Sequence, residues 1–210
     1  MEPMTSVWKD PTKYKDYDKL WPLVSMAKKI VVGDDGYPIN IEKINDQYKG
    51  FYLRKDRPEN PIKWNAITVY QRLPDFQFIA DKIDQRYILL KNEFEKIETV
   101  TQAVINYIGP QSITPLHSDS KTYNGSGQDY VGGVMANGVV APTYQIMIGL
   151  WIPPFDNDEI GLEFPGHGFK TWKTDEALAF DGAYDHQGWN RTDFTRVSLF
   201  IDVLKSSIDE

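Results

Sequence analysis

The chain has 210 residues, a formal net charge of −7 and no cysteine. This length predicts one domain with a sizeable core. The absence of cysteine excludes disulfides, thiolate metal sites and cysteine nucleophiles, so any metal must be held by nitrogen and oxygen ligands. The acidic balance disfavours a broad nucleic-acid-binding surface.

The longest apolar runs, such as residues 146–152, are much shorter than a membrane span. The first residues lack the basic and then apolar regions of a secretion signal. We therefore expect a cytoplasmic protein with no membrane-spanning segment.

Residues 1–96 are polar and interrupted by Gly, Pro and Asp turns. Apolar spacing and alternation predict a helix over 17–29, a strand over 64–71, and one or two helices within 75–96. We expect 1–96 to form a helical and irregular part that packs on a β core spanning 97–204, within a single domain 1–210.

From residue 97 onward, short β-branched stretches alternate with turns, which is typical of an antiparallel sandwich or jelly roll. Strands are expected over 99–108, 144–152, 160–164, 171–172, 177–180 and 196–204. Ser118–Pro142 lacks hydrophobic periodicity and is expected to be a long loop. Its Tyr123, Asp129 and Tyr130 are candidate substrate contacts, with a solvated loop as the alternative.

Two histidines and one carboxylate stand out. His117 and Asp119 are two residues apart, so in an extended segment they project to the same side, and His186 follows 67 residues after Asp119. Two His and one carboxylate form the facial triad of non-haem Fe(II) oxygenases, which leaves positions on the metal open. A surface loop and a structural histidine would give the same pattern, so the motif alone leaves both interpretations open.

Arg196 begins the apolar stretch 196–203, ten residues after His186. A buried arginine is costly unless it is paired, and its same-side neighbours Ser198 and Phe200 supply no acid. A carboxylate ligand would match its charge and fork geometry, and Ser198 can donate to the same carboxylate. An ion pair with an acid elsewhere in the fold would satisfy Arg196 equally.

Residues 180–193 and 196–203 resemble the C-terminal signature of the aspartyl/asparaginyl β-hydroxylase family. That signature is a Phe-Asp-Asp/Gly turn, then His-Glu-x-Trp-Asn, then an Arg-led strand ending in Asp-Val. The stretch 149–153 is similar to the family's Gly-Leu-x-Ile-Pro strand, and 115–117 to its Pro-His segment. The resemblance covers residues 100–204.

The resemblance implies a mainly β fold, a double-stranded β-helix of the jelly-roll or cupin-like type, with supporting helices from the N-terminal half. It also implies an Fe(II)- and 2-oxoglutarate-dependent dioxygenase, which hydroxylates a substrate while it converts 2-oxoglutarate and O2 to succinate and CO2. By resemblance His117 and His186 are iron ligands and Arg196 binds 2-oxoglutarate, with Asn106 as a weaker contact. Asp119 is then expected as the third metal ligand and Ser198 as a partner of Arg196.

Two departures from the family pattern bear on the substrate. Asp119 stands where the animal aspartyl hydroxylases have glycine, which favours three protein ligands here. Gln145 and Met147 stand where the family often has Arg-x-His, which argues against a peptidyl aspartate substrate. A peptide side chain, a free amino acid and another small molecule, including a lipid-linked one, all remain open.

The remaining candidates have smaller roles. His167 is expected in an exposed glycine-rich turn and Trp189 beneath the site. Neighbouring groups should orient the two histidines, and Asp185 and Asn190 lie near His186 in the sequence without an assigned role.

Two other functions fit the same motifs. A cupin-like hydrolase or isomerase with Zn(II) or Mn(II) would use the triad but leave Arg196 and Ser198 without a role. A non-catalytic jelly-roll binding module would bind neither metal nor 2-oxoglutarate.

Overall fold

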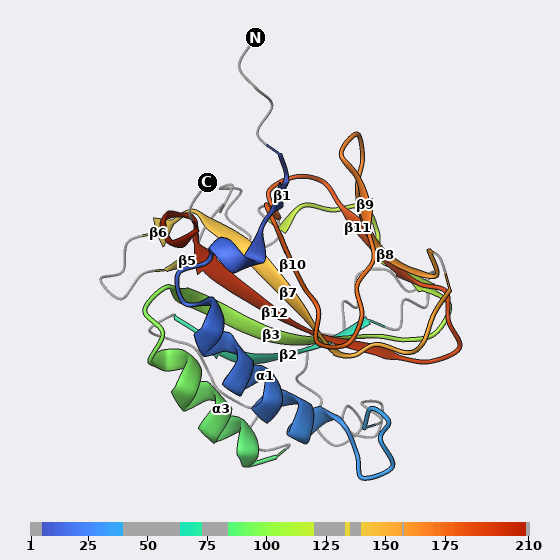
Figure 1. The fold of residues 1–210 in the computed structure, drawn as a ribbon, viewed down its shortest axis with the longest axis horizontal. Helices are drawn as coiled ribbons and strands as arrows, with labels where there is room; N and C mark the ends of the chain where they lie inside the picture. Colours follow the sequence, from blue (N-terminus) through green and yellow to red (C-terminus); the bar gives the residue numbers. More distant parts are fainter. Residues whose placement is uncertain are drawn as a thin grey trace.

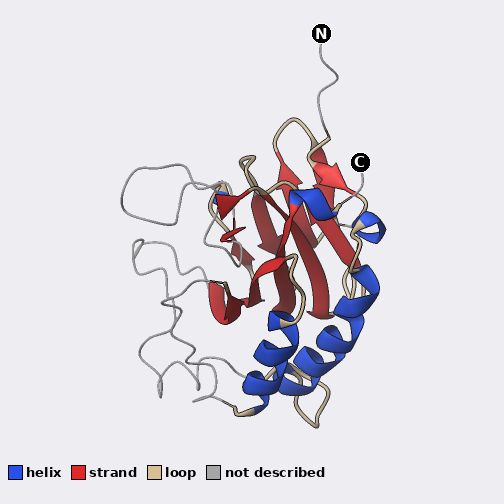
Figure 2. Cartoon of the chain, turned by 90° about the vertical axis from the view of Figure 1, so that its left-hand side faces the viewer, coloured by secondary structure: helices blue, strands red, loops and turns tan. Residues whose placement is uncertain are grey.

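The computed structural model describes residues 6–39, 64–72, 84–119, 133–134, 140–156 and 158–208. In these residues two antiparallel sheets face each other, and two helices cover the outer face of the larger sheet (Figures 1 and 2). The expected mainly β fold with supporting helices is confirmed.

The two helices lie side by side against the larger sheet. They are α1 (Tyr17–Val31) and α3 (Arg86–Glu95). Apolar residues of α1 recur three and four positions apart, which puts them on one buried face: Leu20, Leu23, Val24, Ala27, Ile30 and Val31. Both expected helical regions are therefore helical where they are described, although residues 73–83 lie outside the described part. Two short 3-10 turns, Pro11–Lys13 and Lys205–Ser207, flank the sheet.

The larger sheet has six strands. In spatial order they are β1 (Trp8–Lys9), β10 (Ala177–Phe180), β7 (Thr143–Trp151), β12 (Arg196–Leu204), β3 (Val100–Ile108) and β2 (Trp64–Gln71). The smaller sheet contains β4 (Ser112–Ile113), β11 (Gln187–Asn190), β8 (Ile160–Phe164) and β9 (Gly168–Lys170). A separate pair is formed by β5 (Gly133–Val134) and β6 (Val140–Ala141).

From β3 onward the chain passes back and forth between the two large sheets. Strands β3, β7, β10 and β12 belong to the six-stranded sheet, while β4, β8, β9 and β11 belong to the other. This winding is that of a double-stranded β-helix, as expected. The two-residue strand β1 and the eight-residue strand β2, from the N-terminal part of the chain, extend the larger sheet at its two edges.

One expected strand is wrong. Residues 171–172 are not in a strand, and the ladder partner of β8 is β9, just before them. The segment leaves the sheet because its polar groups bond elsewhere: the Thr174 hydroxyl accepts from Ile152 N at 2.9 Å, and the Glu176 carboxylate accepts from Lys173 N at 2.9 Å. These side chain to backbone bonds hold 172–176 as a loop that crosses the backbone at Gly149.

The larger sheet has two different faces. Its outer face packs on the helices through residues such as Ile146, Leu199 and Ile201. Its inner face looks toward the smaller sheet, where a second core contains Met147, Phe180 and Trp172. Because side chains alternate along a strand, Arg196, Ser198, Phe200 and Asp202 all lie on this inner face.

Residues on the inner face form three rows across β3, β12 and β7. The first row, next to the triad, is polar and contains Gln102, Asp202 and Gln145. The middle row is apolar and contains Val104, Phe200 and Met147, and the third row contains Asn106, Ser198 and Gly149. The inner face therefore offers two polar regions separated by an apolar one.

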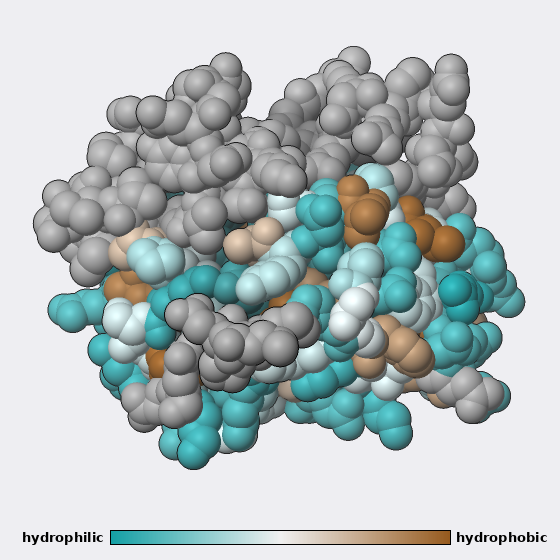
Figure 3. All heavy atoms as spheres, turned by 90° about the horizontal axis from the view of Figure 1, so that it is seen from above, coloured by the Kyte–Doolittle hydropathy of each residue, from teal (hydrophilic) through white to brown (hydrophobic). Residues whose placement is uncertain are grey.

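No helix among the described residues is long and apolar enough to cross a membrane. Seen from above, the described surface is mainly hydrophilic, with small separate groups of hydrophobic atoms (Figure 3).

Candidate functional site

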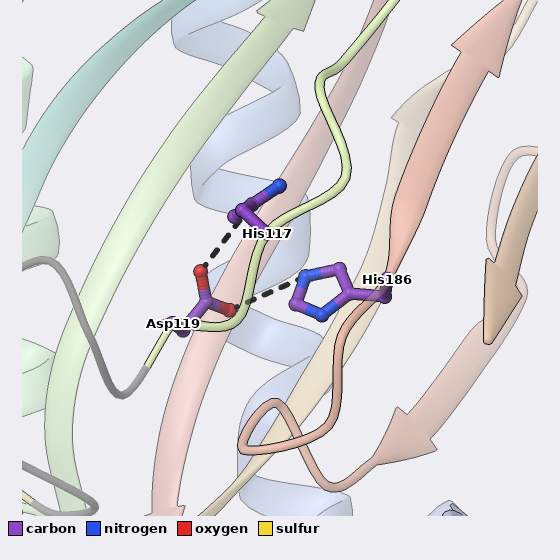
Figure 4. Close-up of side chains that lie close together, drawn as sticks. All are labelled: His117, Asp119 and His186. Atoms are coloured by element: carbon purple, nitrogen blue, oxygen red, sulfur yellow. Dashed lines mark ion pairs between the residues drawn. The ribbon is translucent and has the colours of Figure 1, made fainter. Parts of the chain in front are cut away.

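Three of the expected residues converge at one end of the space between the sheets. His117 and Asp119 follow β4, and His186 immediately precedes β11 (Figure 4). Asp119 Oδ1 lies 3.5 Å from His117 Nε2, and Asp119 Oδ2 lies 3.5 Å from His186 Nε2. One ligand atom from each residue lies within 4.8 Å of the others, and His186 is buried. Side chains 67 residues apart in the sequence thus form one group.

Each histidine ring is oriented by a backbone carbonyl. His117 Nδ1 lies 2.6 Å from Pro115 O, and His186 Nδ1 lies 2.9 Å from Tyr184 O. A carbonyl only accepts, so in each ring Nδ1 carries the proton and Nε2 carries the lone pair. Both Nε2 atoms face Asp119 in the form that binds a metal ion.

Asp119 reaches the histidines because of a close backbone approach. Asp119 N donates to Gly182 O at 3.0 Å. A Cβ atom on Gly182 would lie 3.0 Å from Asp119 Oδ2 and 3.2 Å from Gln145 Oε1, so only glycine fits there without displacing a neighbour. The simple rule that residues i and i+2 share a side is not what unites His117 and Asp119, since Asp119 lies beyond the extended segment.

The donor set fits a divalent metal. A metal with ligands about 2.0–2.2 Å away requires ligand atoms roughly 3–4 Å apart, and the two 3.5 Å separations meet this requirement. Two imidazoles and one carboxylate suit Fe(II), and the described part of the chain offers no cysteine thiolate. His117, Asp119 and His186 would hold the ion.

Arg196 lies on β12 with its guanidinium buried between the sheets. Its residue is 3% exposed, and Nε has no hydrogen-bond partner among the described residues. Burial lowers the pKa of Arg196 to about 9, which leaves it protonated at neutral pH. The guanidinium lies 4.4 Å from the centre of the Trp172 ring, and its Nη2 would lie 3.0 Å from a Cβ on Gly188. A buried cation with no acid beside it is a site for an anion.

Two other expected residues lie next to each other beside Arg196. Ser198 pairs directly with Asn106 across β12 and β3. The Ser198 hydroxyl is buried and has no partner among the described residues. The Asn106 carbonyl oxygen accepts from Trp64 Nε1 at 2.9 Å, which directs its NH2 group away from Trp64. Donors therefore gather at this end of the inner face.

Trp172 adds a donor that sequence reasoning does not assign to the site. The loop over Gly149 carries its ring beneath the Arg196 guanidinium, and its indole N–H is buried with no partner in the described residues. The electron-rich ring stabilises the buried cation. A lone Trp between two strands gives no sequence signal of this contact, which depends on the fold.

Asn190, which the sequence leaves without an assigned role, has a structural one. Its side-chain NH2 donates to Ile108 O, Gly109 O and Phe194 O at 2.9, 3.0 and 2.7 Å. Its oxygen accepts from the Thr192 hydroxyl at 2.7 Å. This buried amide joins the end of β3 to the turn that leads from β11 into β12.

Two other expectations are corrected. Trp189 does not lie beneath the site: alternation along β11 turns Gly188 inward toward Arg196 and Trp189 outward, over Gly161 and beside Phe169. His167 lies in the turn between β8 and β9 and is partly buried against Tyr184 rather than exposed.

Asp185 is exposed, and the Nδ1 atoms of His117 and His186 contact the backbone carbonyls of Pro115 and Tyr184. Tyr123, Asp129 and Tyr130 lie outside the described residues, as does most of the 118–142 segment.

Fold and site together define a double-stranded β-helix with a potential metal-binding triad at one end of its interior and a buried cation on the inner face of the larger sheet. The sequence model of the aspartyl/asparaginyl β-hydroxylase family matches residues 40–206. The chain belongs to this family of hydroxylases.

Similar proteins are more distant. An ornithine lipid ester-linked acyl 2-hydroxylase from Rhizobium tropici is 31% identical over 111 residues, which is 53% of this chain and 32% of that protein. The chain therefore matches less than half the length of that relative. A solved oxidoreductase of the 2OG-Fe(II) oxygenase family from Burkholderia pseudomallei is 11% identical, with a TM-score of 0.40 over 87% of this chain and 88% of that one. A cupin domain from Bordetella pertussis is 15% identical, with a TM-score of 0.33 over 50% of this chain and 82% of that one.

Proposed function

We propose that this protein is an Fe(II)- and 2-oxoglutarate-dependent dioxygenase that hydroxylates a substrate. In the overall reaction, a substrate C–H, O2 and 2-oxoglutarate yield a C–OH, succinate and CO2. The observation that carries the proposal is the presence, inside one β-helix, of a triad that fits a metal and of a buried Arg196 that has no acid partner among the described residues.

The residues at the Arg196 end would bind the far carboxylate of 2-oxoglutarate. Arg196 supplies the charge and Ser198 a hydroxyl donor, and Trp172 holds the guanidinium from its other face. Asn106, next to Ser198 in the ladder, contributes an amide donor. Each donor is already buried in the absence of a ligand, so binding requires little reorganisation.

The residues at the triad end would hold the metal. His117 and His186 present neutral Nε2 atoms, and Asp119 supplies the negative charge that lowers the net charge of the ion. Bound iron supplies the activation of O2, which protein side chains alone do not perform. The Phe164 and Phe180 rings, 5.1 and 5.9 Å from the His186 ring, cover one side of the triad and would keep water from that side.

The substrate is a separate question. A peptide side chain, a free amino acid, a lipid-linked acyl group and another small molecule are the candidates. The family description favours an aspartyl or asparaginyl side chain, and the Rhizobium relative favours an acyl chain.

Anaerobic titration of apo-protein with Fe(II) and then 2-oxoglutarate tests the proposal. We expect a visible charge-transfer band that needs both additions, and succinate formation once O2 is admitted. A metal hydrolase or isomerase would form neither the band nor succinate, and a non-catalytic module would bind no metal. Either result would overturn the proposal.

A further inference from the structure

Gln145 and Asp202 form a polar pair that the proposed cosubstrate site does not use. They face each other across β7 and β12, in the polar row next to the triad. The Gln145 side chain hydrogen-bonds to the Asp202 carboxyl. Alternation puts Asp202 on the same inner face as Arg196, six residues away along β12.

This pair lies against the triad. Gln145 Oε1 lies within 3.2 Å, and Asp119 Oδ2 within 3.0 Å, of one point, the position of a Cβ on Gly182. Gln145 Oε1 is buried and has no hydrogen-bond partner in the described part of the chain. A buried acceptor without a hydrogen-bond partner destabilises the fold, so its presence beside a proposed metal ligand indicates that a bound group donates a hydrogen bond to it.

The pair is also without a cation. No lysine or arginine of the described residues forms an ion pair with Asp202. Two cationic side chains of the described residues have other partners: Lys205 pairs with Asp181, and Arg196 lies on Trp172.

The two polar regions of the inner face therefore have opposite character. Donors gather around Arg196 and Ser198, whereas acceptors gather around Gln145, Asp202 and Asp119. Phe200 and Met147 separate them. A carboxylate would be attracted by the donors around Arg196 and repelled by the acceptors around Asp202.

We propose that Gln145 and Asp202 form the substrate subsite beside the metal, and that this subsite selects a substrate carrying a hydrogen-bond donor and rejects one carrying a carboxylate. The donor group, an amide or an ammonium, would bond to Gln145 Oε1 and the Asp202 carboxyl. This inference rests on the proposed function, because it takes the triad to be the reacting centre.

Three probes of similar size test the inference: N-acetyl-asparagine amide, its aspartate counterpart with a free side-chain carboxylate, and its 2,4-diaminobutyrate counterpart with an ammonium. Each is titrated anaerobically at pH 8 into protein loaded with Fe(II) and 2-oxoglutarate, and the shift of the charge-transfer band is followed. We expect the asparagine or the ammonium probe to shift the band at a concentration at least tenfold lower than the aspartate probe. If the asparagine probe acts at the lower concentration, the subsite prefers a neutral donor. If the ammonium probe does, it prefers a charged one.

Substitution at Gln145 provides the matched comparison. Gln145→Arg puts a cation beside the triad and is expected to reverse the preference toward the aspartate probe. Gln102→Arg puts the same cation on the other side of Asp202, in β3, and is expected to keep the preference of the unsubstituted protein. Asp202→Asn, which preserves shape, is expected to weaken the ammonium probe more than the asparagine probe.

The outcomes separate the two proposals. If no band forms with Fe(II) and 2-oxoglutarate, the proposed function fails. If the band forms but the aspartate probe acts at an equal or lower concentration, or no probe shifts the band, the inference about Gln145 and Asp202 is wrong while the proposed function stands. The inference would also be contradicted if Gln102→Arg reversed the probe preference as much as Gln145→Arg does.

Discussion

The backbones of His117 and His186 bond to each other in both directions, with N···O distances of 3.0 Å from His117 N and 2.7 Å from His186 N. In each segment the ring Nδ1 then contacts the carbonyl two residues earlier. The two imidazoles are thus carried by one backbone bridge and held by the same type of Nδ1 contact, with their ring planes tilted by 48°.

This bridge predicts that both histidines are required for the metal. His186→Ala should weaken Fe(II) binding by more than the roughly 10–100-fold that loss of a ligand's hydrogen-bond partner causes. The charge-transfer band should disappear at the Fe(II) concentration that saturates the unsubstituted protein. His167→Ala is the matched control, because His167 is the third histidine and lies outside the triad. An equal loss in the control would contradict the assignment.

Asp119→Ala tests whether a carboxylate ligand is needed. Because Asp119 contacts both Nε2 atoms at 3.5 Å, we expect its loss to weaken Fe(II) binding strongly and to abolish succinate formation. Equilibrium metal titration and a succinate assay measure the two effects. Retention of iron-dependent turnover would show that two histidines suffice, as in the animal aspartyl hydroxylases.

Arg196→Lys tests the carboxylate anchor. Lysine keeps a charge but lacks the planar fork, and it stacks less well on Trp172. We expect the Kd for 2-oxoglutarate to rise by roughly 30-fold or more, which corresponds to about 2 kcal/mol or more, with little change in Fe(II) affinity. Ser198→Ala should give a smaller rise. Unchanged 2-oxoglutarate affinity in Arg196→Lys would remove this residue from the cosubstrate site.

Two glycine substitutions separate the ends of the site. Gly182→Ala places a Cβ 3.0 Å from Asp119 Oδ2, whereas Gly188→Ala places one 3.0 Å from Arg196 Nη2. We expect the first to weaken Fe(II) binding and the second to weaken 2-oxoglutarate binding. Each variant is the control for the other, measured by the same two titrations. Identical effects would indicate a general disturbance of the fold rather than two separate regions.

Burial, and then the nearby Asp119 charge, raise the pKa of Asp202 to about 7, which predicts a pH dependence of stability in the apo-protein. The folded state holds the Asp202 proton up to about pH 7, whereas the unfolded chain loses it near pH 3.8. The stabilising contribution is therefore complete below about pH 4 and is lost as the pH rises toward and through 7. Asp202→Asn should remove this loss, on the order of a few kcal/mol. Denaturant unfolding at pH 5 and pH 8 measures it, with the exposed Glu98→Gln as control. The same pH dependence in Asp202→Asn and unsubstituted protein would assign it to other groups.

Sequence patterns were sufficient for the long elements. Helical spacing predicts α1, and apolar or β-branched stretches predict β2, β8, β10 and β12 closely. Strands β4, β9 and β11 are short and consist largely of polar residues and glycine, so no apolar pattern marks them, and none of them is predicted. The segment 171–172 has strand-forming residues, but side chain to backbone bonds keep it out of the ladder.

The same division applies to the site. The spacing of His117, Asp119, His186 and Arg196, with the family resemblance, predicts which residues lie together. The contacts of Trp172 and the close approach at Gly182 depend on loops that cross the sheet, so no local pattern reveals them. Asp202 is different: its alternation with Arg196 and Ser198 along 196–202 already places it on the inner face.

The buried amide of Asn190 has a consequence for the size of the cosubstrate. By bonding to the end of β3 and to the turn before β12, it fixes the strand that follows His186 relative to the strand that begins with Arg196. The span from metal to guanidinium is then a property of the backbone and not of flexible side chains. A fixed distance between the two ends of the site selects ligands by length. It should favour 2-oxoglutarate, a dicarboxylate with five carbons, over oxaloacetate, which is one carbon shorter. A single amide that touches neither end of the ligand would thus set the length that the site accepts.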